Sequence, residues 1–560
     1  MAIAVATAAT IAPAAWAGVV AYPSSETIFA SGPLPPGGSG RIALNTAVGE
    51  REAALLVVPG AAQVAVSVDR NRLGPVALRL SFAHFVSFGH RLVPDALLPW
   101  SGAARRTEHS NQPILAQVEV PYGTSPGRYS ARLSVTADAR TTAVPLSVHV
   151  FPVVLPRPGT RGTLLTSFNV SPGTYVSEAR TLYELGSKKQ LTDANDALFS
   201  FFARERLSPG SWGFGEPRTG AGYGSSSRWW LSSIDDMARE MAGGPFSAMR
   251  IPISNNRTSR RNYIGGLSPF APATWCDYLR AVHSTWQERG WLSGGAVPYL
   301  YAYDEPDLGD KRLVAKQAET AHRCFPGAQT LTTTNPTTDG RDRFLWDGRG
   351  GDDLDIWAIL SRRYYGSFTS PARADRSRRN LRAIDRLRAR GKSIWAYTYA
   401  GPGTPGFLAT EPLSDPRMFL LWTALEGIRG VLYGEGTTSY RVGANPLQEV
   451  ASGGEFVLLY PGAQGPIASA RLEQIRDGIE DWQILKEVRR RHGLATVRSV
   501  LGGAGLFSAD RARVRLACSV GCPLKGAKPF SWPRWSHDVS TPRRIDQAHL
   551  QALRLASSGP

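Results

Sequence analysis

Short segments in which apolar and polar residues alternate fill the first part of the chain, from residue 21 to residue 156. Alternation with a period of two is typical of strands that bury one face. Clusters of Gly, Pro, Ser and Asn separate the segments and indicate turns. The clearest segments are residues 53–58, 63–68, 76–82, 114–120, 129–135 and 142–150. The pattern predicts an antiparallel β-sandwich domain over residues 21–158.

The pattern changes after residues 151–159, whose prolines favour a stiff linker. Beyond it, apolar segments of strand length alternate with longer segments of helical period. We expect strands at residues 163–170, 208–214, 247–253, 296–303, 329–334, 354–360, 393–399 and 430–434. Helix candidates lie between most of them, at residues 191–206, 274–290, 311–324, 373–390 and 416–427. Eight strands that alternate with helices predict an α/β fold, a (β/α)8 barrel of the TIM type, over residues 159–492.

A further helix is predicted at residues 465–492, after the last strand. Apolar residues recur in it at three- and four-residue steps, which indicates one buried face. The charged residues between them are Arg476, Asp477, Glu480 and Asp481. Charges at helical spacing more often form ion pairs than catalytic sites. We therefore expect this helix to close the barrel, with its charges paired at the surface or at the barrel bottom.

The two ends of the chain lie outside these domains. Residues 1–17 are Ala-rich and apolar and end on Ala15, Trp16 and Ala17, the small-x-small pattern of a signal-peptidase site, although no basic segment precedes them. We expect residues 1–20 to direct export, and the protein to be secreted or held at the cell surface. Residues 493–560 match no barrel element. We predict that this extension packs on the barrel, with a carbohydrate-binding platform as the alternative.

Four cysteines fit an exported chain without requiring it. Cys518 and Cys522 are close enough to form a small disulfide loop, whereas Cys276 and Cys324 either pair or remain core thiols. A zinc site at Cys518 and Cys522 is the less favoured interpretation, because no His lies at ligand spacing from them. No segment after the first approaches the roughly 20 uninterrupted apolar residues of a membrane-spanning helix.

Composition narrows the class of protein. With 42% hydrophobic and 20% charged residues, the 560-residue chain fits a folded protein of two or more domains. The formal net charge of +18 would suit a polyanion, but the basic residues are scattered and no nucleic-acid motif accompanies them, so we expect no nucleic-acid partner. The phosphate-binding loop, the zinc-protease helix motif and the Gly-x-Ser-x-Gly elbow are not evident, which argues against nucleotide-dependent enzymes, metalloproteases and serine esterases.

Two adjacent carboxylates end the fourth predicted strand. Asp304 and Glu305 follow the apolar residues 297–303 and precede Pro306. Because strand side chains alternate between faces, neighbouring acids can address one substrate only where the backbone turns, and Pro306 favours such a turn. Active sites of parallel barrels are assembled at the carboxyl ends of the strands, so the pair is a candidate for acid chemistry. The alternative is that both acids only open a loop and cap the helix that begins near Asp310.

Three motifs in a fixed order carry a family resemblance. They are Tyr-Ala-Tyr-Asp-Glu-Pro at residues 301–306, Gly-Val-Leu-Tyr at residues 430–433 and Arg-Leu-Glu-Gln-Ile-Arg-Asp-Gly-Ile-Glu-Asp-Trp at residues 471–482. Together they resemble the catalytic domain of glycoside hydrolase family 123 and its wider relatives, over residues 162–491. Residues 122–129 are also similar to an element of the sandwich domain that precedes such barrels.

The resemblance implies an exported, retaining β-N-acetylgalactosaminidase whose nucleophile is the substrate's own 2-acetamido group. Asp304 would orient that group as it closes to an oxazolinium ion, and Glu305 would protonate the departing glycosidic oxygen. Such an acid must keep its proton near neutral pH, and a neighbouring anion in a partly desolvated site favours the protonated form. Substrate-assisted enzymes need no carboxylate nucleophile. The implied partner is an oligosaccharide, polysaccharide or glycoconjugate, and no cofactor or metal is expected.

Aromatic and polar residues at the later strand ends are candidates to bind the sugar. They are Asn335, Tyr364, Tyr365, Trp395, Tyr397, Tyr399, Tyr433, Glu435 and Tyr440. For each aromatic residue, core packing explains its presence equally well. Trp395, Tyr397 and Tyr399 share one strand face, and an inward face would place Tyr399 nearest the site.

One position departs from the family's pattern. The wider family commonly carries a Trp shortly after the Leu-Tyr of the last strand, whereas here Gly434 and Glu435 follow Tyr433. Glu435 could bind a hydroxyl, pair with Arg441, or act as a second carboxylate across from Glu305. In the last case a two-carboxylate mechanism on a different glycoside would follow. A non-catalytic carbohydrate-binding relative and a hydrolase of another polymer are the remaining alternatives.

Overall fold

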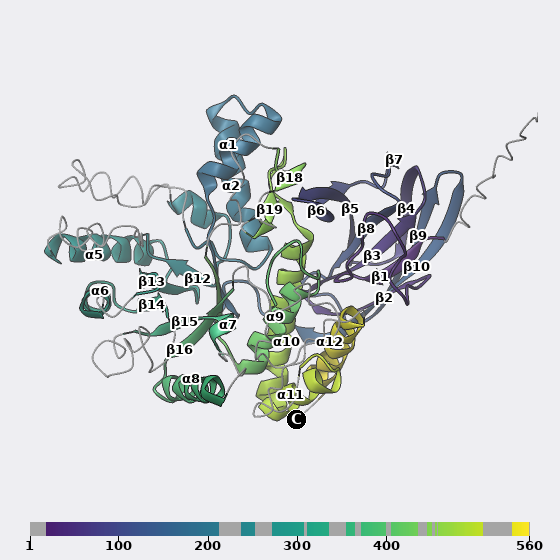
Figure 1. The fold of residues 1–560 in the computed structure, drawn as a ribbon. Helices are drawn as coiled ribbons and strands as arrows, with labels where there is room; N and C mark the ends of the chain where they lie inside the picture. Colours follow the sequence, from purple (N-terminus) through teal and green to yellow (C-terminus); the bar gives the residue numbers. More distant parts are fainter. Residues whose placement is uncertain are drawn as a thin grey trace, which may run out of the picture.

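The fold was analysed in a computed structural model of the chain. It describes residues 18–211, 237–252, 272–306, 311–334, 354–364, 371–398, 405–434, 445–450, 454–455, 457–507 and 540–558. Two regions stand side by side: a region of mainly antiparallel sheets, and a parallel sheet surrounded by helices (Figure 1). We refer to them as the sheet region and the barrel. The long helix α10 (Ala470–His492) lies between them.

The sheet region holds two sheets. The first contains β1 (Val20–Pro23), β3 (Arg51–Pro59), β8 (Asn111–Glu119), β5 (Ala77–Phe88) and β6 (Arg91–Trp100), with β18 (Glu449–Val450) parallel to β5. The second contains β2 (Ile42–Val48), β10 (Arg140–Val154), β9 (Gly127–Ala137), β4 (Gln63–Arg72) and β7 (Arg105–Arg106). One apolar core joins the two, with Leu56 and Phe82 from the first sheet and Leu133 and Val148 from the second. The predicted strands in this part of the chain are confirmed.

The barrel is a parallel sheet that nearly closes on itself. Its spatial order is β11 (Leu165–Phe168), β17 (Gly430–Tyr433), β16 (Ser393–Tyr397), β15 (Ile356–Leu360), β14 (Gln329–Thr333), β13 (Val297–Tyr303) and β12 (Ala248–Arg250). The described residues thus provide seven strands, against the eight that the sequence predicts. Each of the seven coincides with a predicted strand.

The remaining predicted strand, residues 208–214, begins between β11 and β12 without forming a regular strand. Pro209 makes a single parallel bridge to Phe168. Ser208 contacts both neighbours: its carbonyl accepts the N–H of Phe168 at 2.9 Å, and its Oγ accepts the N–H of Ala248 at 3.2 Å. Residues 212–214 lie outside the described part of the chain. The segment therefore occupies the gap in the barrel through polar contacts at Ser208.

Helices cover the outside of the barrel (Figure 1). They are α1 (Pro172–Tyr183), α2 (Lys188–Arg204), α5 (Pro272–Glu288), α6 (Lys311–Cys324), α7 (Ser361–Tyr364), α8 (Pro371–Ala389) and α9 (Asp415–Glu426). Outward-facing strand residues pack with these helices in one large core. Inward-facing residues such as Tyr299, Leu331 and Trp395 form a separate cluster that fills the interior. The five helix predictions in this region are confirmed to within three residues.

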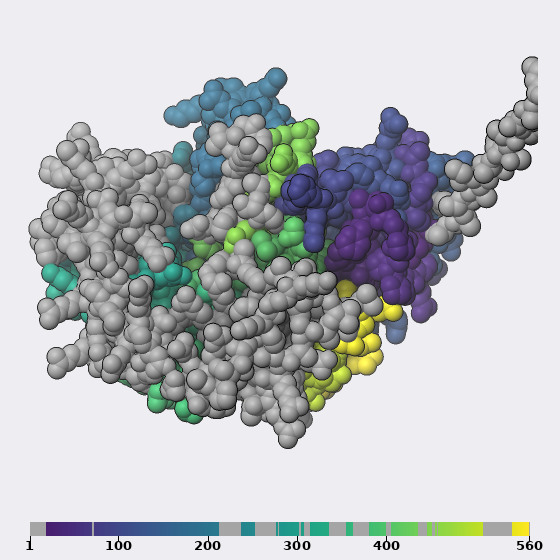
Figure 2. Space-filling view, in the orientation of Figure 1, coloured from purple at the N-terminus to yellow at the C-terminus, as the bar shows by residue number. Residues whose placement is uncertain are grey.

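The carboxyl-terminal part packs on both regions. The small sheet of β19 (Leu459–Tyr460) and β20 (Ile467–Ala468) precedes α10, and α11 (Leu494–Gly503) and α12 (Thr541–Ser557) follow it. Helix α12 contacts α10 and the strands β2 and β10. In the space-filling view α12, in yellow, lies against the sheet region, in purple (Figure 2). The extension was predicted to pack on the barrel, and it also contacts the sheet region.

Helix α10 is buried over most of its length, including its charged residues. These form ion pairs with both regions. The closest contacts join Arg471 to Asp95 at 2.8 Å, Arg206 to Glu480 at 2.7 Å and Arg417 to Asp481 at 2.6 Å. The predicted ion pairs are therefore present, and the burial of their side chains contradicts only the predicted surface location. The helical period indicated one buried face, whereas the sheet region covers the other.

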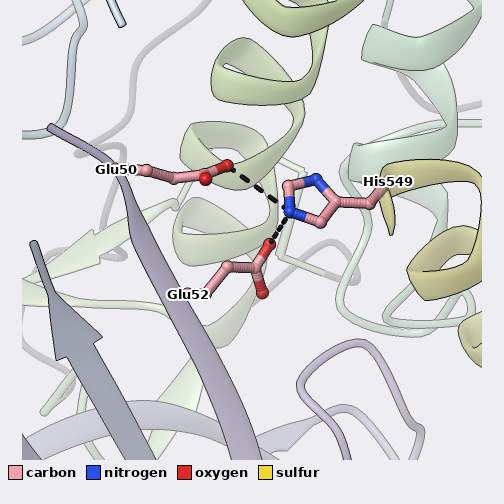
Figure 3. Close-up of side chains that lie close together, drawn as sticks. All are labelled: Glu50, Glu52 and His549. Atoms are coloured by element: carbon pink, nitrogen blue, oxygen red, sulfur yellow. Dashed lines mark ion pairs between the residues drawn. The ribbon is translucent and has the colours of Figure 1, made fainter. Parts of the chain in front are cut away.

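His549 brings α12 into the same interface (Figure 3). Its Nδ1 lies 2.7 Å from Asp481 Oδ1, and its Nε2 lies 3.0 Å from the carbonyl of Asn45 and 3.8 and 3.7 Å from Glu50 and Glu52. Burial alone would lower the pKa of His549, but the facing carboxylates outweigh it and raise the pKa to about 10. Glu50, Glu52 and His549 are close enough to hold a metal ion. Both ring nitrogens nevertheless face acceptors, which fits a protonated imidazolium that attaches α12 to the sheet region.

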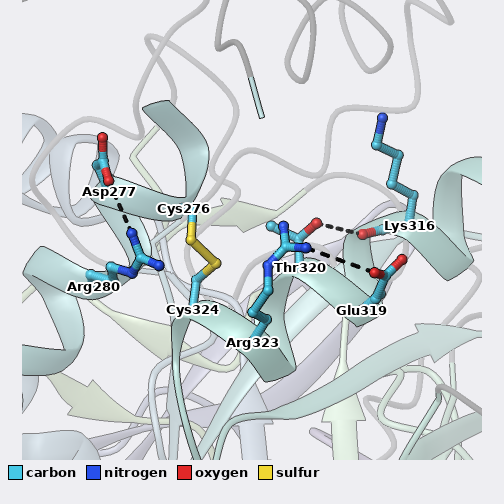
Figure 4. The surroundings of a disulfide bond; sticks show 8 residues. All are labelled: Cys276, Asp277, Arg280, Lys316, Glu319, Thr320, Arg323 and Cys324. Atoms are coloured by element: carbon cyan, nitrogen blue, oxygen red, sulfur yellow. Dashed lines mark hydrogen bonds and ion pairs between the residues drawn. A yellow bond between two sulfur atoms is a disulfide. The ribbon is translucent and has the colours of Figure 1, made fainter. Parts of the chain in front are cut away.

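Cys276 of α5 and Cys324 of α6 form a disulfide on the outside of the barrel (Figure 4). Their Cα atoms are 5.2 Å apart. Of the two alternatives left open by the sequence, pairing is therefore the one observed. Cys518, Cys522 and residues 1–17 lie outside the described residues. Within the described ranges, no helix combines the length and the apolar content that crossing a membrane requires.

Candidate active site

Asp304 and Glu305 follow β13 directly, at the carboxyl end of the barrel. Just before them the pairing of β13 with β14 is irregular: Tyr301 pairs with Leu331, and Tyr303 pairs with the next residue, Thr332. Such an irregularity changes the direction of the side chains that follow it. Asp304 accordingly reaches Tyr301 of the barrel interior.

Two hydroxyl groups hold one oxygen of Asp304. Its Oδ1 accepts hydrogen bonds from Tyr301 at 2.9 Å and from Thr333 at 2.8 Å. Both donors are buried, whereas Asp304 is partly exposed. Burial and then the nearby charge of Asp304 raise the pKa of Tyr301 well above its ordinary value, so the phenol stays a proton donor. The other oxygen, Oδ2, has no partner among the described residues and can face a substrate.

Glu305 has a backbone conformation that is unusual for a residue with a side chain. Its φ is +43°, in the left-handed region. That region costs a non-glycine residue roughly 1–2 kcal/mol. The N–H of Glu305 donates to Thr333 Oγ1 at 2.7 Å, and its Oε1 accepts a hydrogen bond from Tyr397 at 3.0 Å. Because Tyr397 also faces the interior, the turn brings both acids to the same end of the barrel.

A buried cation lies beside Tyr301, one of the residues that bond Asp304. Arg250 ends β12, is 3% exposed, and donates to the carbonyl of Gly210 at 2.6 Å. Its guanidinium lies 5.3 Å from the centre of the Tyr301 ring. Neither Arg250 nor Thr333 is among the site residues predicted from the sequence. Their only signal in the sequence is that each lies within a predicted strand, which is true of many residues.

The middle of the chain matches a family model described as glycoside hydrolase 123, catalytic domain, over residues 245–488. This region is a glycoside hydrolase 123 catalytic domain. The match begins just before β12 and runs to the last third of α10. It contains Asp304, Glu305 and the described residues whose hydrogen bonds to them are given above, Tyr301, Thr333 and Tyr397. The chain is therefore a glycosidase with a carbohydrate substrate.

A solved family 123 glycoside hydrolase from Clostridium perfringens has a similar fold. The two chains are 13% identical, the likeness covers 96% of this chain and 98% of that one, and the TM-score is 0.64. Its structural analysis concerned glycolipid glycan hydrolysis. A GH10 xylanase from termite gut with a bacterial Ig-like domain is 11% identical, with 79% of this chain and 100% of that chain covered, but the TM-score of 0.32 is too low to support an argument. No curated protein sequence matches the chain.

Within the glycoside hydrolase domain, two of the predicted sugar-binding aromatics face the barrel interior. Trp395 and Tyr397 share the inward face of β16, as the alternation of the strand indicated. Tyr397 lies at the carboxyl end of β16 and bonds Glu305, and its predicted contact with the sugar stays a prediction. Trp395 is fully buried, with its ring 5.6 Å from that of Tyr299, so it supports the site from below.

Two other candidates have positions that contradict direct sugar binding. Tyr364 is fully buried, and its hydroxyl donates to Glu426 at 3.1 Å on the outer, helical side. Tyr433 is 1% exposed and packs against Phe407 and Phe168 in the same outer core. Strand periodicity groups residues by face, but it does not tell which face is inward. Asn335, Tyr365, Tyr399, Glu435 and Tyr440 lie outside the described residues, so their predicted roles stay predictions.

Proposed function

We propose that this glycosidase releases a β-linked N-acetylhexosamine, N-acetylgalactosamine first among them, and that the substrate's 2-acetamido oxygen is the nucleophile. The observation that supports this is the arrangement of two adjacent carboxylates with separate partners. Asp304 is held by Tyr301 and Thr333, and Glu305 is held by Tyr397. Two carboxylate groups with different hydrogen-bond donors at one strand end suit two different tasks on one sugar.

In the proposed first step, Asp304 accepts the acetamido N–H through Oδ2. The carbonyl oxygen of that group attacks C1, the bond from C1 to the glycosidic oxygen breaks, and Glu305 transfers its proton to the departing oxygen. The product is an oxazolinium ion, which the charge of Asp304 stabilises. Glu305, now ionised, takes a proton from the water that attacks C1 and reopens the ring. Two inversions at C1 give overall retention.

A two-carboxylate mechanism is the second candidate. Gly434 directly follows β17, and four steps of the sheet order separate β17 from β13. Glu435, the candidate second carboxylate, is the next residue along the chain and lies outside the described residues. This mechanism requires no acetamido group on the substrate. The choice of substrate therefore separates the two candidates.

The decisive experiment compares aryl β-N-acetylgalactosaminide and β-N-acetylglucosaminide with plain hexosides and pentosides. Wild type is compared with Glu305→Gln and Asp304→Asn. The matched controls are Glu319→Gln and Asp193→Asn, which make the same chemical changes at exposed side chains. We expect turnover of 2-acetamido sugars alone, lowered about 10²- to 10⁴-fold in both site variants and unchanged in the controls. Turnover of sugars without that group, or site variants as active as wild type, would overturn the proposal.

We also propose that the protein works outside the cytoplasm. The disulfide between Cys276 and Cys324 supports this, because such bonds are rare in cytosolic proteins. The apolar start of the chain, which closes on Ala17, points the same way. The test is to fractionate cells that express the full chain and to sequence the amino terminus of the product. A product in the medium or at the cell surface that begins at Gly18 is expected, and an uncleaved cytosolic product would contradict the proposal.

A further inference from the structure

Thr333 contacts both members of the acid pair through one hydroxyl group. Its Oγ1 lies 2.8 Å from Asp304 Oδ1 and 2.7 Å from the backbone nitrogen of Glu305. Thr333 is 1% exposed, so it is shielded from bulk solvent. A single buried atom thus links the side chain of Asp304 to the backbone of Glu305.

Each of the three donor groups, the Glu305 N–H and the hydroxyls of Thr333 and Tyr301, has one proton, and this fixes the directions of the hydrogen bonds. The N–H of Glu305 can only donate, so Thr333 Oγ1 accepts there and keeps its own proton for Asp304. Tyr301 has one proton for two acceptors, Asp304 Oδ1 at 2.9 Å and Thr333 Oγ1 at 3.1 Å. Thr333 therefore bonds both acids, whereas the hydroxyl of Tyr301, among the described residues, bonds Asp304 and Thr333 and makes no hydrogen bond to Glu305.

The bond from Glu305 to Thr333 also supports a strained backbone. The φ of +43° at Glu305 is unfavourable, and such conformations persist where the surroundings fix them. Without the acceptor on Thr333, the peptide could relax toward an ordinary conformation. The carboxyl group of Glu305 would then move away from Tyr397 and from a glycosidic oxygen.

We propose that Thr333 is a positioning residue that sets the geometry of both carboxylates, and that Tyr301 positions Asp304 alone. This inference rests on the proposed function, in which Asp304 assists the nucleophile and Glu305 is the acid. The two roles respond differently to the leaving group. A basic leaving group such as phenol needs the proton of Glu305, whereas 2,4-dinitrophenol leaves with little help. Nucleophilic assistance by Asp304 is needed for both.

The test measures kcat/KM on phenyl and 2,4-dinitrophenyl β-N-acetylgalactosaminides. For Tyr301→Phe we expect an equal loss on both substrates, about 10-fold. For Thr333→Val we expect kcat/KM to fall about 10²-fold on the dinitrophenyl substrate, because misplacement of a catalytic group by about 1 Å costs activity on this order. On the phenyl substrate we expect kcat/KM to fall a further 10-fold or so. Thr333→Ser keeps the hydroxyl and should restore most of the activity. Thr320→Val, another buried threonine that bonds only within α6, is the matched control.

The outcomes separate this inference from the proposed function. Should Asp304→Asn and Glu305→Gln be impaired while Thr333→Val turns over both substrates like wild type, the positioning role is refuted and the function stands. Wild-type activity in the two carboxylate variants would instead refute the function. A loss in Thr333→Val that is equal for both leaving groups would refute its link to Glu305. If Thr333→Val does not fold, Thr333→Ala and Tyr301→Phe provide the same comparison, and a Tyr301→Phe loss concentrated on the phenyl substrate would contradict the assignment.

Discussion

Arg471, near the start of α10, uses all five of its N–H donors. Two of them form a fork with Asp95 of β6, at 3.0 and 2.8 Å. The other three donate to the carbonyls of Phe407, Gly454 and Val457 at 2.6–2.7 Å. Both charged side chains are at most 2% exposed. The pair therefore fixes the sheet region to the helix without help from solvent.

Substitution of Arg471 by Met keeps an unbranched apolar side chain and removes the charge and every donor. Asp95 would then be a buried carboxylate with one remaining donor, Tyr460, at 2.5 Å. Breaking a buried pair on one side costs about 3–5 kcal/mol, and each of three abandoned carbonyls adds about 1 kcal/mol. We expect a loss on the order of 7 kcal/mol, which is a large share of the 5–15 kcal/mol typical of a folded domain.

The assay is urea unfolding followed by circular dichroism and by tryptophan fluorescence. The double variant Asp95→Asn with Arg471→Met removes the unpaired charge and should recover part of the loss. Arg490→Met on the same helix removes a mostly exposed partner of Glu487 and should leave stability close to that of wild type. If Arg471→Met unfolds within about 1 kcal/mol of wild type, or if the double variant recovers nothing, the reasoning about this pair is refuted.

Three further predictions concern other contacts. The pKa of His549 is raised from 6.5 to about 10, so its contribution to stability is fully present below pH 6.5 and is lost as pH rises through about 10. His549→Gln should therefore flatten the decline of the melting temperature over this range, and an unchanged decline would contradict the assignment. Replacement of Cys276 and Cys324 by Ala should cost about 4 kcal/mol, since the bridged residues are 48 positions apart, and urea unfolding of oxidised and reduced protein measures it. Tyr397→Phe removes the donor to Glu305 and should lower kcat/KM about 10-fold, more on phenyl than on dinitrophenyl glycosides, whereas full activity would exclude a role in orienting the acid.

Periodicity predicted the elements of the barrel well because each strand and helix buries a local pattern of residues. It could not tell which face of a strand points into the barrel and which points toward the helices. Tyr397 and Tyr433 both end predicted strands, yet the first contacts Glu305 and the second packs outward against Phe407. Which face is inward depends on how neighbouring strands pair and how helices cover them, and neither is encoded in a single strand.

The network around the acids could not be predicted for a similar reason. Asp304 and Glu305 stand out because two carboxylates end an apolar segment. Thr333 has no such signal, since it is one of several threonines in a short strand. It reaches the acids only because β14 pairs with β13. The left-handed backbone of Glu305 is equally hidden, because a non-glycine residue gives no hint of it.

The glycoside hydrolase match does not mark out a folding unit. It begins at residue 245, whereas β11 and the segment at Ser208, which complete the barrel wall, come earlier in the chain. Arg471 and Arg417 lie inside the match, but their partners Asp95 and Glu52 belong to the sheet region. A fragment limited to the matched residues would expose an open sheet edge, leave the buried Arg471 without Asp95 and remove Glu52 from Arg417, which would keep Asp481. The sheet region is therefore part of the structure that holds the acid pair in place.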